Sequence, residues 1–215
     1  VHDIAISAKM GDVIVATPDQ KILDLVKNYG GQAMMTNKDH KTGTDRIYEV
    51  FKKKLFKTHE IIINLQGDMP NLNPIVIQNL VNHIKKKTCD IATIASKLDE
   101  NKDLEDENVC KVISKKEIIN NDFATALDFF RLTKNKVPNF TYHHIGIYAF
   151  TSTSLIRYVG LERSKLEIDR SLEQLRALDN KMKIEVGYTD NCPLSIDTEK
   201  DLKKIKEIME NDEKN

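Results

Sequence analysis

The residues that could do chemistry lie in short polar segments beside apolar runs. Asp68 follows the apolar run 60–65 in a Gly-Asp turn, and Pro70 prevents that strand from continuing. Ligands on open parallel sheets bind beyond the carboxyl ends of the strands, where an aspartate can hold Mg²⁺ against substrate phosphates. Taken alone, a Gly-Asp pair after a strand is more often a simple turn.

Asp197 is a second carboxylate that could hold a metal ion. It directly precedes a predicted helix, so it could equally be only a helix cap. Asp68 and Asp197 are far apart in the sequence, and only the fold can bring them together.

The segment from His40 to Arg46 opens a predicted helix and contains a glycine. Gly43 allows a ligand to approach the backbone, and the free amides of a first helical turn can bind polar groups of a base or a phosphate. Capping of the helix by Thr42 or Thr44 explains the same residues, and without further support it is the favoured interpretation.

Two pairs of polar residues could line a pocket. His143 and His144 are neighbours on a predicted strand, so they point to opposite faces and are a poor joint metal site. Glu173 and Gln174 could hydrogen-bond sugar hydroxyls, although such a pair on a helix is normally solvated.

Short apolar runs alternate with amphipathic stretches, and these elements must position the polar segments. Strands are expected at residues 12–16, 32–35, 60–65, 90–96, 109–114, 124–130, 141–150 and 183–188. Helices are expected at residues 1–9, 21–29, 44–56, 74–87, 166–178 and 198–209. The strand-helix alternation of the first half predicts an α/β domain with a mostly parallel central sheet and helices on both faces.

Composition narrows the function classes. The chain has 215 residues, with 33 Lys+Arg against 33 Asp+Glu. This balance does not indicate non-specific electrostatic binding to nucleic acid or to an anionic membrane. No apolar run approaches the roughly 18 residues that cross a bilayer. The three scattered cysteines, Cys89, Cys110 and Cys192, favour a reduced, cytoplasmic compartment over a disulfide framework.

In their order along the chain, these segments resemble the 3-deoxy-manno-octulosonate (KDO) cytidylyltransferase family. The resemblance covers nearly all 215 residues. The matching stretches are Val13–Thr17, Gly30–Gly31, His40–Arg46, Asn64–Pro70, His144–Tyr148, Leu172–Arg176 and Ile196–Thr198, followed by Asp201–Leu202.

The resemblance implies a fold, a reaction and a set of site residues. The fold is a single Rossmann-like nucleotidyltransferase domain over residues 1–215, of the nucleotide-diphospho-sugar transferase type. The reaction transfers CMP from CTP to KDO, with release of pyrophosphate, for lipopolysaccharide biosynthesis in the cytoplasm, by a homodimer that uses Mg²⁺. The metal-binding, catalytic aspartates match Asp68 and Asp197. The nucleotide side matches Thr42, Gly43, Asp45, Arg46, Gln66 and Gly67. The sugar-acid side matches Gln66, Arg131, His144, Tyr148, Glu173 and Gln174.

The sequence also departs from the family pattern. The family begins with a central strand and a basic triphosphate-binding loop, whereas this chain starts at the equivalent of the first helix. We therefore expect an N-terminally incomplete domain with poor CTP binding. Pro18 stands where the family favours an acidic residue, and Asp128 and Phe130 interrupt the run that ends at Arg131.

Two alternatives stay open. One is a cytidylyltransferase for a related sugar acid, such as 8-amino-KDO, because the pocket residues do not separate these substrates. The other is a non-catalytic remnant that binds a nucleotide or a sugar. A dinucleotide-dependent oxidoreductase is disfavoured, because no Gly-x-Gly-x-x-Gly follows a strand.

Overall fold

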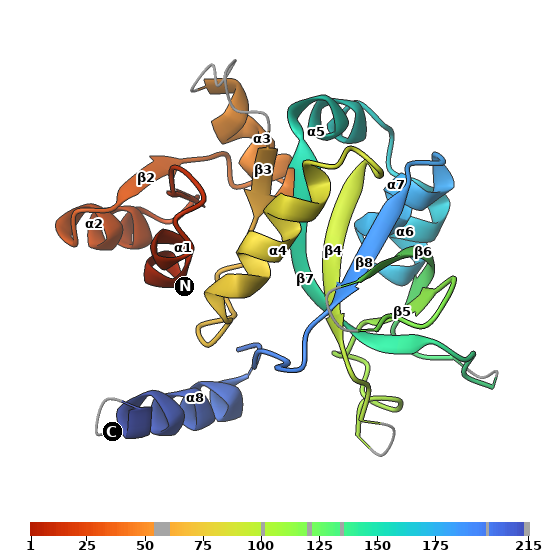
Figure 1. Cartoon of the computed structure of the whole chain (residues 1–215). Helices are drawn as coiled ribbons and strands as arrows, with labels where there is room; N and C mark the ends of the chain where they lie inside the picture. Colours follow the sequence, from red (N-terminus) through yellow and green to blue (C-terminus); the bar gives the residue numbers. More distant parts are fainter. Residues whose placement is uncertain (54–60, 100–101, 120–121, 134–135, 197, 213–215) are drawn as a thin grey trace.

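A computed structural model describes residues 1–53, 61–99, 102–119, 122–133, 136–196 and 198–212. The helices are α1 (His2–Ser7), α2 (Gln20–Asn28), α3 (Gly43–Lys53), α4 (Pro74–Ile84), α5 (Ser152–Val159), α6 (Lys165–Arg170), α7 (Gln174–Asp179) and α8 (Glu199–Asp212). The strands are β1 (Ile14–Thr17), β2 (Gln32–Met35), β3 (Ile61–Asn64), β4 (Ile91–Ser96), β5 (Lys111–Ser114), β6 (Phe123–Phe130), β7 (Thr141–Thr151) and β8 (Ile184–Tyr188). Figure 1 shows their arrangement.

The large sheet is mixed, so the prediction of a mostly parallel sheet is wrong. Its six strands lie in the order β3-β7-β4-β8-β6-β5, and β5 also pairs with β7, which closes the last five strands into a ring. Among the strands that the structure describes in this sheet, only β4 and β8 are parallel neighbours. The error has a simple cause: β7 runs antiparallel between β3 and β4, and apolar periodicity does not report strand direction.

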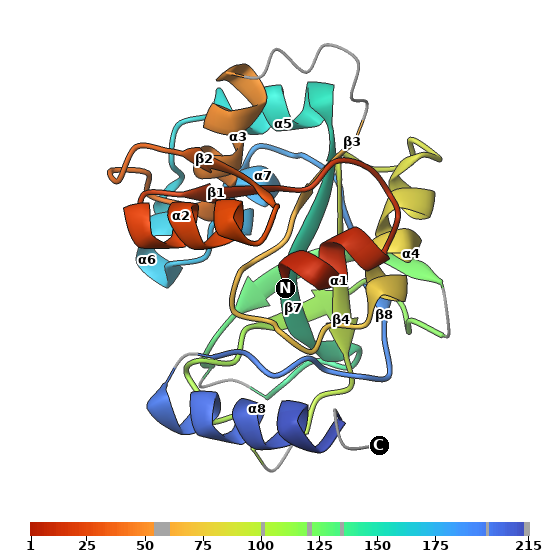
Figure 2. The ribbon, with the colours of Figure 1, turned by 90° about the vertical axis from the view of Figure 1, so that its left-hand side faces the viewer.

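Helices cover both faces of the large sheet, as predicted. Figures 1 and 2 show α4 on one face and α3, α5, α6 and α7 on the other. Val76, Leu80 and Ile84 of α4 pack on one side of the sheet, and Leu155 of α5 and Leu175 of α7 belong to the core on the other side. The helix α8 lies at the bottom of both views, after the segment that leaves β8.

The helical part of the second half differs from the prediction. The single helix expected over residues 166–178 is two short helices, because Ser171 adopts a left-handed conformation (φ 52°) and ends α6. The helix α5 was not predicted at all. The helix expected over residues 44–56 is described as far as Lys53, and the rest of that prediction lies outside the described residues.

The two sheets are separated by a groove. Among the described residues, β1 pairs only with β2, and β3 pairs only with β7. A groove of about 810 Å³ lies between β1 and β3 and is also lined by parts of α1, α3 and α4. Its walls are mostly apolar, with Ile14, Val50, Ile62 and Ile77 among the lining side chains.

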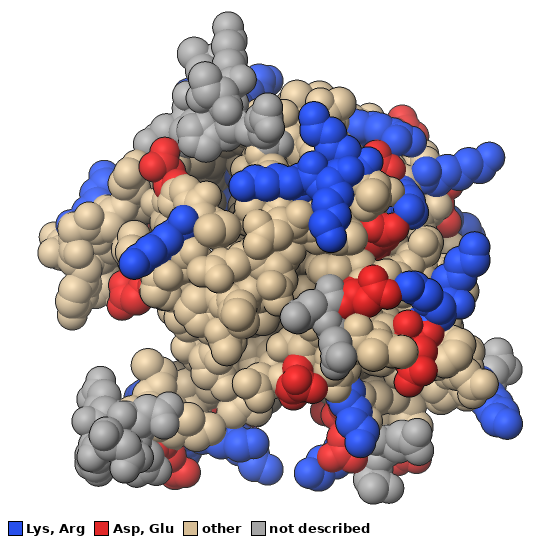
Figure 3. Space-filling model, in the orientation of Figure 1, with Lys and Arg blue, Asp and Glu red and all other residues tan. Residues whose placement is uncertain are grey.

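Charged side chains of both signs share the surface. In the view of Figure 3, Lys and Arg gather toward the top, over the region where α4 ends and α5 lies in Figure 1. Acidic and basic side chains alternate over the lower right part of that face. Among the described helices, none is both long enough and apolar enough to cross a membrane.

Candidate active site

A cavity of about 810 Å³ collects most of the residues that the sequence singled out. It lies between the turn after β3, the first half of β7, the start of α3 and the segment that leads into α7. The predicted site residues that line it are Thr42, Gly43, Gln66, Asp68, Arg131, His144, Tyr148, Glu173 and Gln174. Residues from several distant parts of the sequence therefore share one cavity.

One carboxylate oxygen of Asp68 has no hydrogen-bond donor among the described residues. The turn after β3 is held in the core by Met69 and Leu72, which are 5% and 2% exposed. The Ser195 hydroxyl donates to Asp68 Oδ2 at 3.3 Å. Asp68 Oδ1 is buried and accepts no hydrogen bond from any described residue. A buried carboxylate oxygen without a donor costs free energy unless a ligand or a cation satisfies it.

The fold brings the second predicted aspartate segment to Asp68. The backbone N–H of Ile196 donates to the carbonyl of Asp68 at 3.0 Å, and the N–H of Leu194 donates to Asn71 Oδ1 at 2.9 Å. Asp197 itself lies outside the described residues. Its neighbour in the chain nevertheless contacts Asp68, a proximity that the sequence spacing did not suggest.

At the start of α3, Thr42 caps the helix and Gly43 lies close to the Gln66 side chain. The Asp45 backbone N–H donates to Thr42 Oγ1 at 3.1 Å, and the Thr42 hydroxyl donates to Asp45 Oδ2 at 2.8 Å. Thr42 thus caps the helix, which is one of the two interpretations that the sequence allowed for this segment. A Cβ on Gly43 would lie 2.9 Å from the Gln66 amide nitrogen, so a larger residue would displace the Gln66 side chain. The same turn therefore satisfies the helix end and packs against the residue that follows β3.

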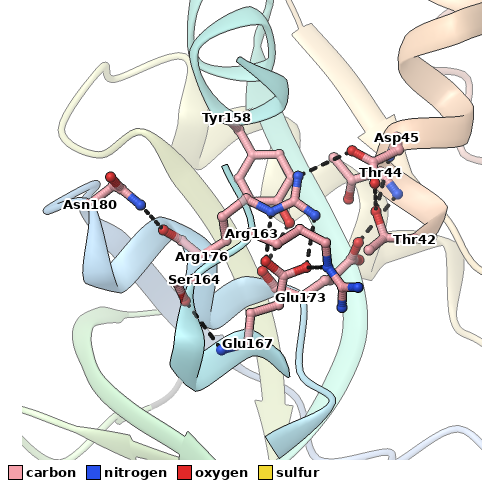
Figure 4. A network of polar contacts seen from close by, with 10 residues as sticks. All are labelled: Thr42, Thr44, Asp45, Tyr158, Arg163, Ser164, Glu167, Glu173, Arg176 and Asn180. Atoms are coloured by element: carbon pink, nitrogen blue, oxygen red, sulfur yellow. Dashed lines mark hydrogen bonds and ion pairs between the residues drawn. The ribbon is translucent and has the colours of Figure 1, made fainter. Parts of the chain in front are cut away.

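A buried charge network fixes this turn against α6 and α7 (Figure 4). Arg176, 2% exposed, donates two hydrogen bonds to the fully buried Glu167, at 2.8 and 2.9 Å. A third hydrogen bond joins Arg176 to Asp45 at 3.2 Å, and the guanidinium lies 4.7 Å from the centre of the Tyr158 ring. Burial would raise the pKa of Glu167, but hydrogen bonds from Arg176 and Arg163 outweigh it and lower that pKa.

The other side of the cavity is lined by buried hydrogen-bonding groups. His144, 6% exposed, pairs through Nε2 with the Thr93 hydroxyl at 2.9 Å, and burial lowers its pKa to about 3. The Tyr148 hydroxyl donates to Gln174 Oε1 at 3.2 Å, and burial raises the Tyr148 pKa. Burial also raises the pKa of Glu173, which accepts a hydrogen bond from the Thr44 backbone N–H. These groups can form hydrogen bonds with hydroxyls of a ligand.

Arg131 provides a cation at the cavity despite the irregular sequence before it. Its guanidinium donates to the carbonyls of Glu107 and Asn108 at 2.9 and 2.7 Å. Asp128, which interrupts the family run, pairs with Arg170 at 2.7 Å and not with Arg131. The departure from the family pattern thus leaves Arg131 in the cavity lining.

Three predicted residues do not line this cavity. Arg46 and Gly67 line the groove between β1 and β3, where Arg46 also donates to the Thr36 hydroxyl at 2.7 Å. Asp45 lines neither space and instead pairs with Arg176. For Asp45 the structure indicates a supporting position behind the cavity wall.

Several lining residues were missed by sequence reasoning. Lys41, Arg163 and Glu167 line the cavity, and so does Cys192, whose Sγ lies 3.7 Å from His143 Nδ1. Lys41 lies within the matched stretch from His40 to Arg46, so that stretch could have indicated it. The other three carry no signal in the sequence: Glu167 is a charged residue on an amphipathic helix, where such residues are usually solvated, and Arg163 and Cys192 lie outside the helices and strands.

Comparisons with known proteins show which family the chain belongs to. A family model described as cytidylyltransferase matches residues 1–184. A 3-deoxy-manno-octulosonate cytidylyltransferase of Bartonella henselae is 38% identical over 210 residues, which cover 97% of this chain and 86% of that protein. A protein of the same name from Afipia carboxidovorans is 38% identical over 203 residues, 94% of this chain and 81% of its own length.

Solved structures are similar in fold. A CMP:2-keto-3-deoxy-manno-octonic acid synthetase complexed with CTP superposes with a TM-score of 0.86 at 29% identity, over 98% of this chain and 86% of that one. A 4-diphosphocytidyl-2C-methyl-D-erythritol synthase from Anaerococcus prevotii shares the fold alone, with a TM-score of 0.60 at 16% identity over 97% of this chain and 86% of its own. The chain belongs to the cytidylyltransferase family, among the 3-deoxy-manno-octulosonate cytidylyltransferases.

Proposed function

We propose that the protein transfers CMP from CTP to KDO and releases pyrophosphate. The observation that carries this proposal is the single cavity shared by the segments that resemble the family's nucleotide and sugar-acid sites. Relatives that are 38% identical over nearly the whole chain carry the name of this activity. A structure with a TM-score of 0.86 is titled as a complex with CTP.

The residues of the chain can act mainly by positioning the two substrates. Gly43 and Gln66 form the tight wall on the nucleotide side. Glu173 and Gln174 offer hydrogen bonds to sugar hydroxyls, and Arg131 offers a positive charge to a carboxylate or a phosphate. Attack of a sugar hydroxyl on the α-phosphate, with departure of pyrophosphate, then depends on alignment and on stabilisation of charge at phosphorus.

We propose that Asp68 and Asp197 hold Mg²⁺. The fit rests on Asp68, whose buried Oδ1 lacks a hydrogen-bond donor among the described residues. A carboxylate oxygen is the kind of ligand that a hard cation such as Mg²⁺ prefers. The backbone contact of Ile196 with Asp68 supports a contribution from the next residue. When bound, the ion would lower the pKa of the attacking hydroxyl and offset charge at the α-phosphate.

Substitution of Asp68 tests the metal proposal. The variant Asp68→Asn keeps the shape of the side chain and removes its charge, so Mn²⁺ binding followed by electron paramagnetic resonance should weaken, and turnover should fall. Asp122→Asn is the matched control, because Asp122 forms an exposed ion pair with Lys116 at 2.6 Å and does not line the cavity. Unchanged Mn²⁺ binding in Asp68→Asn would exclude Asp68 as a ligand.

The predicted additional strand and basic loop remain a proposal. The groove between β1 and β3 supports it, because two apolar strands there face each other and pair, among the described residues, only on their other sides. A strand inserted between β1 and β3 would pair with the backbone N–H and C=O groups of both edges and would join the two sheets. Comparing CTP binding by residues 1–215 and by the full-length gene product tests this point, and equal affinity would contradict it.

A substrate panel tests the reaction and its alternatives. Pyrophosphate release by the full-length gene product should require CTP and KDO together, with little release from UTP. Faster release with 8-amino-KDO would favour the related sugar acid. No release with any sugar acid, but a thermal shift with CTP, would favour the non-catalytic alternative. Participation in lipopolysaccharide synthesis, a cytoplasmic location and a homodimeric state belong to the same proposal, and light scattering of the purified protein tests the last.

A further inference from the structure

A second group of potential ligand atoms lies apart from the cavity, where α4 turns into β4. The group consists of His83, Cys89 and Glu185, whose ligand atoms all lie within 4.8 Å of one another. None of the three lines the candidate active site. The proposed reaction therefore gives these residues no role.

Local structure explains why the three side chains meet. His83 is in the last turn of α4, and the N–H groups of Lys86 and Lys87 donate to the carbonyls of His83 and Ile84, which folds the chain back. This turn places Cys89 just before β4. Glu185 comes from β8, which pairs in parallel with β4 so that Ala92 and Glu185 are partners in the ladder.

Neighbouring groups orient the ring and the carboxylate. The His83 ring stacks on Phe123 with centroids 3.6 Å apart and planes 4° from parallel. Its Nε2 lies 2.6 Å from Glu185 Oε2, and Lys183 Nζ lies 2.6 Å from Glu185 Oε1. The hydroxyl of Thr88 donates to Glu185 Oε2 at 3.0 Å. Such outer contacts hold the ligand atoms of metal sites in place.

The site is shielded from solvent and its donor set is selective. His83 and Glu185 are each 9% exposed, and Cys89 is half-buried. Imidazole, thiolate and carboxylate together suit Zn²⁺ or Co²⁺, whereas Mg²⁺ prefers oxygen ligands alone. Burial, and next the charge of Glu185, raise the pKa of Cys89 to about 12, so without a cation the thiol keeps its proton.

The distances are compatible with tetrahedral coordination. Bonds of about 2.0–2.1 Å to nitrogen and oxygen and about 2.3 Å to sulfur place tetrahedral ligand atoms roughly 3.3–3.6 Å apart. The three ligand atoms lie within 4.8 Å of one another, and the contact between His83 and Glu185, now 2.6 Å, would open by about 0.7 Å. Three protein ligands leave a fourth position for water.

We propose that His83, Cys89 and Glu185 bind a Zn²⁺ ion that links α4, the turn into β4, and β8. Binding exchanges the thiol proton for the metal, with release of that proton to solvent. The bound ion joins elements that meet far from the reacting groups, so it stabilises the fold and does not enter the CMP-transfer reaction. The proposal is independent of the proposed function.

Titration with Co²⁺ under reducing conditions tests the site. A cobalt–thiolate centre gives a ligand-to-metal charge-transfer band in the near ultraviolet and intense tetrahedral absorption in the visible, which an aspartate site does not. We expect one equivalent of Co²⁺ to produce both absorption features in the protein, and we expect Zn²⁺ to displace the bound Co²⁺. Cys89→Ser should abolish the charge-transfer band and weaken binding by more than tenfold, because a directly bound ligand is lost.

Cys192→Ser is the matched control, because Cys192 Sγ also lies near a histidine, at 3.7 Å from His143 Nδ1, and Cys192 is not one of the three proposed ligands. It should keep the band. Thermal unfolding in EDTA should be similar for Cys89→Ser and the unmodified protein, which shows that the variant folds. The absence of a charge-transfer band in the unmodified protein, or its loss in Cys192→Ser with retention in Cys89→Ser, would overturn the proposal.

Discussion

The buried charge network beside the cavity predicts a large loss of stability when Arg176 is changed. Arg176→Met keeps most of the side-chain volume and removes the charge. It leaves Glu167, which is fully buried, with Arg163 as its remaining guanidinium partner, at 2.8 Å, and it removes the contact with Asp45. Loss of one partner from a buried ion pair costs about 3–5 kcal/mol, and we expect a value near the lower end because Arg163 remains.

This loss can be measured by thermal and urea unfolding. For a chain of 150–250 residues, 1 kcal/mol shifts Tm by roughly 2–4 °C, so a loss of about 3 kcal/mol lowers Tm by about 6–12 °C. Arg157→Met is the matched control, because Arg157 is half exposed and pairs with Asp90 at 3.5 Å. An exposed pair of this kind contributes no more than about 1 kcal/mol.

A double variant separates charge from packing. Glu167→Gln in the Arg176→Met background removes the uncompensated carboxylate, so the double variant should be less destabilised than the sum of the two single variants predicts. Equal Tm losses in Arg176→Met and Arg157→Met, or strict additivity in the double variant, would refute the idea that this network stabilises the cavity wall.

Three further predictions follow from the same geometry. Gly43→Ala places a Cβ 2.9 Å from the Gln66 amide nitrogen, so the KM for CTP should rise about tenfold with little change in Tm, and unchanged steady-state kinetics would contradict the close approach. The pKa of Glu167 is lowered on folding, so its stabilising contribution is complete above pH about 4.5 and is lost as the pH falls below that value; urea unfolding from pH 7 to pH 3 should show this loss, and its absence in Glu167→Gln is the control. Burial opposes ionisation of Cys192 but the hydrogen bond to His143 lowers its pKa, while burial raises the pKa of Cys110 to about 12; iodoacetamide followed by peptide mass spectrometry should therefore label Cys192 first, and preferential labelling of Cys110 would contradict the assignment.

Much of the candidate site could be predicted because its residues lie in compact motifs. The turn at Asp68 and the glycine at Gly43 each stand at the end of a regular element, where an α/β fold places its ligands. Tyr148 was inferred only from the resemblance, since nothing in its local pattern distinguishes it from a core residue.

The parts that could not be predicted depend on long-range geometry. The direction of β7 follows from its pairing with β3 and β4, which no local periodicity reports. The apolar spacing of residues 166–178 continues across Ser171, although the backbone there turns left-handed and separates α6 from α7. That break allows Arg176 to hydrogen-bond Glu167. A single continuous helix over residues 166–178 does not predict this contact.

Transfer of CMP to KDO is tested by following the α-phosphate of CTP. The protein would be incubated with CTP labelled at the α-phosphate, KDO and Mg²⁺, and the products separated and identified by mass spectrometry. We expect the label to appear in CMP-KDO in amounts equal to the pyrophosphate released. Label that stays in CTP, or that appears only in free CMP, would contradict it.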